Sequence, residues 1–186
     1  MKTGGGKAKG GEFERYCCKR LSLWVTKGKR DDVFWRSAMS GGRATLQLRQ
    51  EIVNMAQSGD MTAIAPEGYE LCSLCLFEYK HYRDLKIANG LLKDTGFLAE
   101  FWRATVKAAA RYDKAPVLIC KQNLLPPIVL CAPGLKLFRG PPVMTIHSWN
   151  AAVYLFETAT HVVRRPQAKH APTANDRLAP RRLPRE

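Results

Sequence analysis

Hydrophobic residues recur every three or four positions in several segments of the chain, the spacing that lines one face of an α-helix. This spacing predicts helices over 11–24 and 96–112, and a short helix or an ordered insertion over 44–56. A last helix is predicted from Ser148, a good N-cap residue, through Phe156. The helix over 96–112 offers four side chains for packing: Phe97, Phe101, Val106 and Ala109.

Short apolar runs between turn residues predict strands at 33–36, 115–121, 127–131 and, as an edge strand, 142–147. The segment 60–80 has the pattern of an antiparallel hairpin that turns around Gly68–Tyr69. Its second arm, 71–77, is apolar on both faces, as expected of a central strand. Helices and strands in this order predict an α/β domain with a mixed β-sheet flanked by α-helices.

Both ends of the chain differ in composition from its middle. Residues 1–10 are rich in Gly and Lys, and 164–186 alternate Arg and Lys with Pro and Ala. Such segments cannot bury enough apolar surface to fold, so we expect disordered basic tails around one domain at 11–163. The N-terminus lacks an apolar signal-peptide stretch, and no charge-free run is long enough for a bilayer. We therefore expect no membrane partner and a cytoplasmic location, in the host cytoplasm if the protein is phage-encoded.

The chain is strongly basic, with 30 Lys and Arg against 16 Asp and Glu and a net charge of +14. Its hydrophobic content of 46% is that of an ordinary globular protein, so the charge does not imply disorder throughout. A charge of this size predicts a polyanionic partner, nucleic acid first and an anionic membrane surface second. The six cysteines of a chain without an export signal are expected to be free thiols.

Three residues of the predicted hairpin, Asp60, Glu78 and Lys80, suggest metal chemistry. Glu78 and Lys80 are two positions apart in a strand, so their side chains share a face. Asp60 falls opposite Glu78 across the predicted turn, and cross-strand Cβ atoms are about 5 Å apart. Two carboxylates this close can share Mg²⁺ or Mn²⁺, beside which an ammonium could orient a water that attacks a phosphate. The structural alternative is an exposed Glu78–Lys80 ion pair, with Asp60 capping a turn.

Four segments, in order, resemble the PD-(D/E)XK nuclease superfamily, and within it the archaeal-type and phage Holliday-junction resolvases. Gly11-Glu12-Phe13-Glu14-Arg15 is similar to the first helix of the family, and Arg36 to Gly42 to its Arg…Ser-Gly-Gly loop. Ser58-Gly59-Asp60 is similar to the acidic position of the second strand, and Phe77-Glu78-Tyr79-Lys80-His81 to the Glu-x-Lys strand. The resemblance covers about 10–83 and implies a restriction-endonuclease-like fold.

The resemblance also implies roles for single residues. Asp60, Glu78 and the backbone carbonyl of Tyr79 would be metal ligands, and Glu14 would complete the acidic cluster directly or through water. Lys80 would lie next to the attacking water, so the candidate catalytic residues are Glu14, Asp60, Glu78 and Lys80. The candidate DNA contacts are Arg15, Arg36, Ser40, Arg43, His81 and the turn residues Lys27, Lys29 and Arg30. That turn is either a flexible clamp on phosphates or simply a solvated loop.

The function expected from these residues and the resemblance is that of a metal-dependent endonuclease acting on branched or structured DNA. The resemblance alone implies a homodimer that places two sites on two strands. The interval 43–57 is longer than in the archaeal resolvases, and the basic C-terminal tail has no counterpart there. Two alternatives stay open: a noncatalytic basic protein that binds DNA or RNA, and an RNA-directed nuclease on the same fold.

Overall fold

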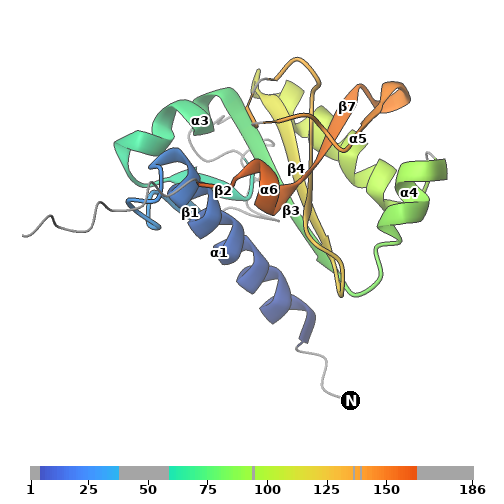
Figure 1. Cartoon of the computed structure of the whole chain (residues 1–186), viewed down its shortest axis with the longest axis horizontal. Coiled ribbons are helices and arrows are strands. Elements are labelled where there is room, and N and C mark those ends of the chain that lie inside the picture. The colour runs from blue at the N-terminus through green and yellow to red at the C-terminus, as the bar shows by residue number, and fades with distance from the viewer. Residues whose placement is uncertain (1–4, 38–58, 94, 136, 139, 163–186) are drawn as a thin grey trace, which may run out of the picture.

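The computed structural model of the chain describes residues 5–37, 59–93, 95–135, 137–138 and 140–162. A sheet with helices on both sides dominates this part of the chain (Figure 1). Its strands follow the order β3-β4-β5-β7-β6. Their bounds are β3 Cys75–Tyr82, β4 Ala115–Gln122, β5 Ile128–Cys131, β6 Met144–Ile146 and β7 Ala151–Leu155.

The pairing of these strands is mixed. Strands β3 and β4 are parallel, and the chain between them forms the helices α4 (Ile87–Lys93) and α5 (Phe97–Ala110). The pairs β4–β5, β5–β7 and β6–β7 are antiparallel. The structure thus confirms the predicted α/β class with a mixed sheet, in which β3 lies at one edge and β6 at the other.

The segments before β3 cover one face of the sheet and extend past its β3 edge. They comprise α1 (Gly5–Val25), β1 (Phe34–Arg36), β2 (Met61–Ala63), the 3₁₀-helix η2 (Pro66–Gly68) and α3 (Tyr69–Leu74). Strands β1 and β2 form a separate antiparallel pair. Two short elements flank β7 in the chain: the 3₁₀-helix η3 (His147–Trp149) and α6 (Phe156–Ala159).

Alternating strand residues build a core on each face of the sheet. The first core joins α1 to one face through Phe13, Cys17, Leu21, Phe77, Tyr79, Val117 and Ile119. The second joins α5 to the other face through Leu98, Trp102, Leu118, Cys120 and Leu130. The apolar spacing of the first helix therefore marks its buried side, as predicted. All six cysteines are buried and free.

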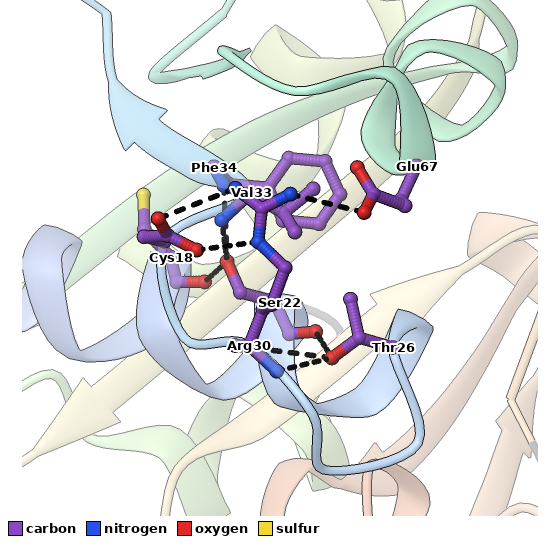
Figure 2. A network of polar contacts seen from close by, with 8 residues as sticks. Cys18, Ser22, Thr26, Arg30, Val33, Phe34 and Glu67 are labelled. Atoms are coloured by element: carbon purple, nitrogen blue, oxygen red, sulfur yellow. Dashed lines mark hydrogen bonds and ion pairs between the residues drawn. The ribbon is translucent and has the colours of Figure 1, made fainter.

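Ser22 ties helix α1 to strand β1 through buried hydrogen bonds (Figure 2). Its Oγ donates to the Cys18 carbonyl and accepts the backbone N–H groups of Val33 and Phe34 at 3.1 and 3.0 Å. Farther along, the Arg30 guanidinium reaches the Glu67 carboxylate of η2. This network holds the chain that enters β1 against the last turns of α1.

The predicted hairpin over 60–80 is wrong. The first arm, β2, pairs with β1, and residues 69–74 form the helix α3 instead of the first half of a strand. Packing explains the difference, because Gly68 lies so close to β1 that an added Cβ would come within 2.5 Å of the Phe34 ring. The chain is thereby held against β1 and enters a helical turn that buries Leu71 and Cys72.

The helix predicted from Ser148 through Phe156 is also wrong. Residues 151–155 are β7, which pairs with strands on both sides and buries four of its five residues in succession. Asn150, at φ +47°, turns the chain into this strand, and only the short α6 follows it. Helix α4 was not predicted, because Gly90 interrupts its apolar pattern; this glycine packs against Leu98.

Only the N-terminal boundary of the predicted domain can be compared with the described residues. Helix α1 begins at Gly5, before the predicted domain start at residue 11. The expected C-terminal tail and the element expected at 44–56 lie outside the described residues. Of the helices that the structure describes, none is long and apolar enough to cross a membrane.

Candidate active site

Asp60 binds the outer edge of strand β3 with both its main chain and its side chain. Its N–H donates to the Phe77 carbonyl at 2.8 Å, and its Oδ2 accepts the Tyr79 N–H at 2.9 Å. These two contacts flank Glu78 in the chain. The expectation that Asp60 lies next to Glu78 therefore holds, although a hairpin does not produce it.

Gly59 makes this close approach possible. Its φ is +84°, a conformation that residues with a side chain rarely adopt. A Cβ on Gly59 would lie 2.5 Å from the Phe77 carbonyl oxygen, which is the acceptor of the Asp60 N–H. The Gly-Asp dipeptide is thus the local sequence that places an acidic residue on the edge of β3.

Glu78 and Lys80 form a short ion pair on the face of β3 that looks toward α5. Lys80 Nζ lies 2.6 Å from Glu78 Oε1, and each side chain is 26% exposed. The same Nζ lies 5.6 Å from the ring centroid of Phe101 in α5, a cation–π contact. The predicted sharing of one face is confirmed, and the pair is half-buried rather than fully solvated.

Glu14 reaches the region from helix α1. Arg36 Nε forms an ion pair with its Oε2 at 2.8 Å, while no hydrogen bond satisfies this buried oxygen. Gly11, one turn earlier in α1, gives the Arg36 guanidinium room, because a Cβ there would lie 3.0 Å from Nη1. Glu14 and Arg36, far apart in sequence, thus form an ion pair between α1 and β1.

The acidic groups influence one another. Burial and the charge of Glu78 raise the pKa of Asp60 from 3.8 to about 7, and Glu14 acts in the same direction. The Tyr79 N–H and Lys80 favour the charged form but do not outweigh these effects. Burial alone would lower the pKa of Lys80, but the Glu78 carboxylate raises it, so Lys80 is a cation. A buried carboxylate near two others is a place where added positive charge would stabilise the protein.

The donors at this edge suit a hard cation such as Mg²⁺ or Mn²⁺. Asp60 and Glu78 supply carboxylates, and Glu14 supplies a buried oxygen that lacks a hydrogen bond. The carbonyl of Tyr79 points to the same side of β3 as its N–H, which binds Asp60. No three His, Cys, Asp or Glu side chains among the described residues converge as a ready-made metal cluster. The fit to a hard cation thus rests on the type of the oxygen donors and not on a preassembled cluster among the described residues.

A scan against protein-family models matches residues 5–148 to a family described as "phage putative PDDEXK endonuclease". The match covers more than half of the chain and includes every element from α1 to β6. The chain belongs to this PDDEXK endonuclease family. Searches of curated proteins and of solved structures gave no match.

Family membership confirms the PD-(D/E)XK resemblance, and the protein is a nuclease with a restriction-endonuclease-like fold. PD-(D/E)XK nucleases generally use divalent metals. In this PDDEXK endonuclease, Asp60 lies directly before β2, and Glu78 and Lys80 lie in β3.

The predicted DNA contacts of this PDDEXK endonuclease lie in different places. Arg15 is exposed on α1, and His81 follows Lys80 with its Nε2 3.0 Å from Asn123 Oδ1. Lys27 and Lys29 are exposed beyond the end of α1, which lies about 16 Å along the helix axis from Glu14 at 1.5 Å per residue. Ser40 and Arg43 lie outside the described residues.

Arg30 differs from its two neighbours in the turn. Its guanidinium already binds Asp32 at 2.9 Å and Glu67 at 3.0 Å. Its charge is thus shared with two carboxylates, whereas Lys27 and Lys29 extend into solvent.

Two supporting glycines of the site were not predicted as functional. A signal for Gly59 existed, since a glycine in a strand pattern often marks the close approach of another backbone. For Gly11 there was none, because its neighbour Arg36 comes from a distant strand.

Proposed function

We propose that the protein is a metal-dependent endonuclease that hydrolyses phosphodiester bonds in branched or otherwise structured DNA in the cytoplasm. The observation that carries the proposal is the attachment of Asp60 to the Tyr79 N–H, which brings a buried carboxylate beside Glu78 and Lys80. A buried carboxylate with a pKa near 7 is costly unless a cation accompanies it.

Mg²⁺ or Mn²⁺ would be held by Asp60, Glu78 and the Tyr79 carbonyl, with Glu14 as a further ligand, directly or through water. When bound, such an ion polarises a scissile phosphate and lowers the pKa of a bound water. The ion pair with Lys80 neutralises Glu78 in the metal-free protein.

The other residues act on the substrate. The Lys80 ammonium would orient the attacking water or neutralise the charge that develops on the phosphate. Arg36 neutralises Glu14 and, being partly exposed, is available to a DNA phosphate. The proposed phosphate contacts are Arg15, His81, Lys27, Lys29, Arg30, Ser40 and Arg43.

The preference for DNA and for branched structures rests on the net charge of +14 and on the similarity to Holliday-junction resolvases. A homodimer would present two such sites to two strands, as a symmetric junction requires.

The test incubates labelled four-way junction, flap and linear duplex with the protein in Mg²⁺, Mn²⁺ or EDTA. Glu78→Gln and Lys80→Ala should reduce cleavage at least a hundredfold and leave DNA binding within about threefold, because other residues supply most phosphate contacts. Glu70→Gln and Lys107→Ala, exposed residues of the same types, are matched controls. Cleavage that persists in EDTA, or in both site variants, would refute the proposed mechanism.

The same assay separates the alternatives. A noncatalytic binding protein predicts salt-dependent binding without metal-dependent nicking of any substrate. An RNA-directed nuclease predicts cleavage of an RNA hairpin in preference to the DNA junction. The family match favours an endonuclease over the noncatalytic protein.

A further inference from the structure

Three aromatic rings form a continuous strip from α5 to the end of β3. Phe97 and Phe101 stack with ring centroids 6.3 Å apart and planes at 21°. Phe101 and Tyr82 stack with centroids 5.4 Å apart and planes at 23°. The near-parallel rings of Phe97, Phe101 and Tyr82, here called the aromatic strip, thus follow one another across two elements.

The outer rings of the strip are open to solvent. Phe97, which the helix pattern assigned to the core, is 61% exposed, and Tyr82 is 46% exposed. Helix α5 buries Leu98, Ala99 and Trp102 instead. Single exposed aromatic residues are ordinary, but a stacked series of them is a surface that suits another flat group.

The strip begins at the candidate active site. Lys80 Nζ, the ammonium paired with Glu78, lies 5.6 Å from the Phe101 ring centroid. Tyr82 is two positions after Lys80 in β3, so both side chains leave the strand on the same face. A group stacked on the strip would therefore belong to the nucleotide at the cleaved phosphate or to one next to it.

A hollow of about 320 Å³ lies beside Phe97, between α4 and α5. Lys86 and Lys93 contribute two ammonium groups to its wall and Asn89 an amide, against one carboxylate from Glu100. Lysines can bind phosphates, and an amide can both donate to and accept from the edge of a base. The strip and the hollow together complement the three features of a nucleotide. The aromatic rings suit its flat base, the Asn89 amide suits the polar edge of the base, and the two lysines suit its phosphate.

We infer that the aromatic strip stacks an unpaired base of the DNA substrate next to the phosphate that is cut. This inference rests on the proposed function and narrows its substrate class to DNA with unpaired nucleotides at the cleavage position. In a continuous duplex the faces of the bases are covered by their neighbours, so a paired base has no face to offer. A flap, a gap or an open junction has such faces, and stacking on an aromatic side chain accepts any base.

The first test measures affinity in EDTA, so that cleavage does not interfere. The probes are a fully paired duplex and the same duplex with a short unpaired flap. Phe97→Ala and Tyr82→Ala should each weaken flap binding about tenfold, or about 1.4 kcal/mol, and leave duplex binding within twofold. Tyr69→Ala, which removes a similarly exposed aromatic ring from α3, should change neither. Phe97→Trp should retain the preference for the flap, because it keeps a stacking face.

The second test places 2-aminopurine, a fluorescent base that is quenched when stacked, in the flap next to the junction. Wild-type protein should change its emission, and the Phe97→Ala, Tyr82→Ala double variant should not. Unchanged flap affinity in that double variant, or loss of binding to a matched RNA flap but not to the DNA flap, would overturn the inference. Failure of the proposed function would differ, since it would appear as absence of metal-dependent cleavage with these binding results intact.

Discussion

Replacing Asp60 with asparagine separates two effects of its buried carboxylate: the loss of stability that its charge causes, and its proposed role in holding a metal ion. Asparagine has the same shape, and its side-chain oxygen can still accept the Tyr79 N–H, which Asp60 binds at 2.9 Å. The substitution removes the charge that Glu78 and Glu14 repel and Lys80 attracts, and it replaces one oxygen by an NH₂ group. In metal-free protein we therefore expect Asp60→Asn to be more stable than the wild type at alkaline pH.

The pKa of Asp60 sets the size of this effect. A carboxyl whose pKa rises from 3.8 in the unfolded chain to about 7 in the fold makes the protein lose stability as the pH rises between those values. At about 1.4 kcal/mol per pH unit, the loss is about 4 kcal/mol in total. The gain from Asp60→Asn should thus be close to zero near pH 4 and approach about 4 kcal/mol at pH 8.

Urea unfolding in EDTA at several pH values measures this difference. Asp84→Asn, which changes an exposed carboxylate, should leave the free energy of unfolding within about 0.5 kcal/mol at each pH. Addition of Mg²⁺ should stabilise the wild type, by about 2.7 kcal/mol at a hundred times its dissociation constant, but not Asp60→Asn. An Asp60→Asn protein that is less stable than the wild type at pH 8 would refute the placement of Asp60 in a repulsive, desolvated site.

Two further substitutions test the supports of the site. Gly59→Ala should destabilise the protein by about 1–3 kcal/mol in urea unfolding, because Gly59 has a positive φ and an added Cβ would lie 2.5 Å from the Phe77 carbonyl oxygen. Gly134, with open space around it, is the control, and Gly134→Ala should cost less than about 1 kcal/mol. Equal losses in the two variants would contradict the argument. Ser22→Ala leaves the buried N–H groups of Val33 and Phe34, at the entry to β1, without their acceptor and should cost about 2–4 kcal/mol. The exposed Ser73→Ala is its control, and a loss from Ser22→Ala below about 0.5 kcal/mol would show that water replaces the hydroxyl.

Local sequence patterns predicted the elements whose apolar positions have one clear period. Helices α1 and α5 and strands β4, β5 and β6 lie where the spacing placed them. The pattern was ambiguous wherever a segment is buried on all sides. Strand β7 buries residues 151–154 in succession, so its sequence lacks the alternation that distinguishes a strand from a buried helix.

The aromatic residues of α5 show a second limit. Apolar type and helical spacing made Phe97 and Phe101 available for core packing, but Phe97, the first residue of the helix, is exposed. Burial depends on which strand the helix covers and on how far it extends beyond that strand. A single sequence carries no direct signal for either, which is why the aromatic strip was found only in the structure.

The juxtaposition of Asp60 and Glu78 was predicted from a hairpin that does not exist. It occurs for a different reason. A hairpin would have made the two residues cross-strand neighbours through a continuous ladder. Instead, one main-chain hydrogen bond to Phe77 and one side-chain hydrogen bond to Tyr79 attach the residue before β2 to the free edge of β3. Gly59 permits that contact, and the helical detour of α3 leaves it intact. The attachment depends on few contacts, so substitutions at Gly59 and Asp60 should affect the site more than changes anywhere in α3.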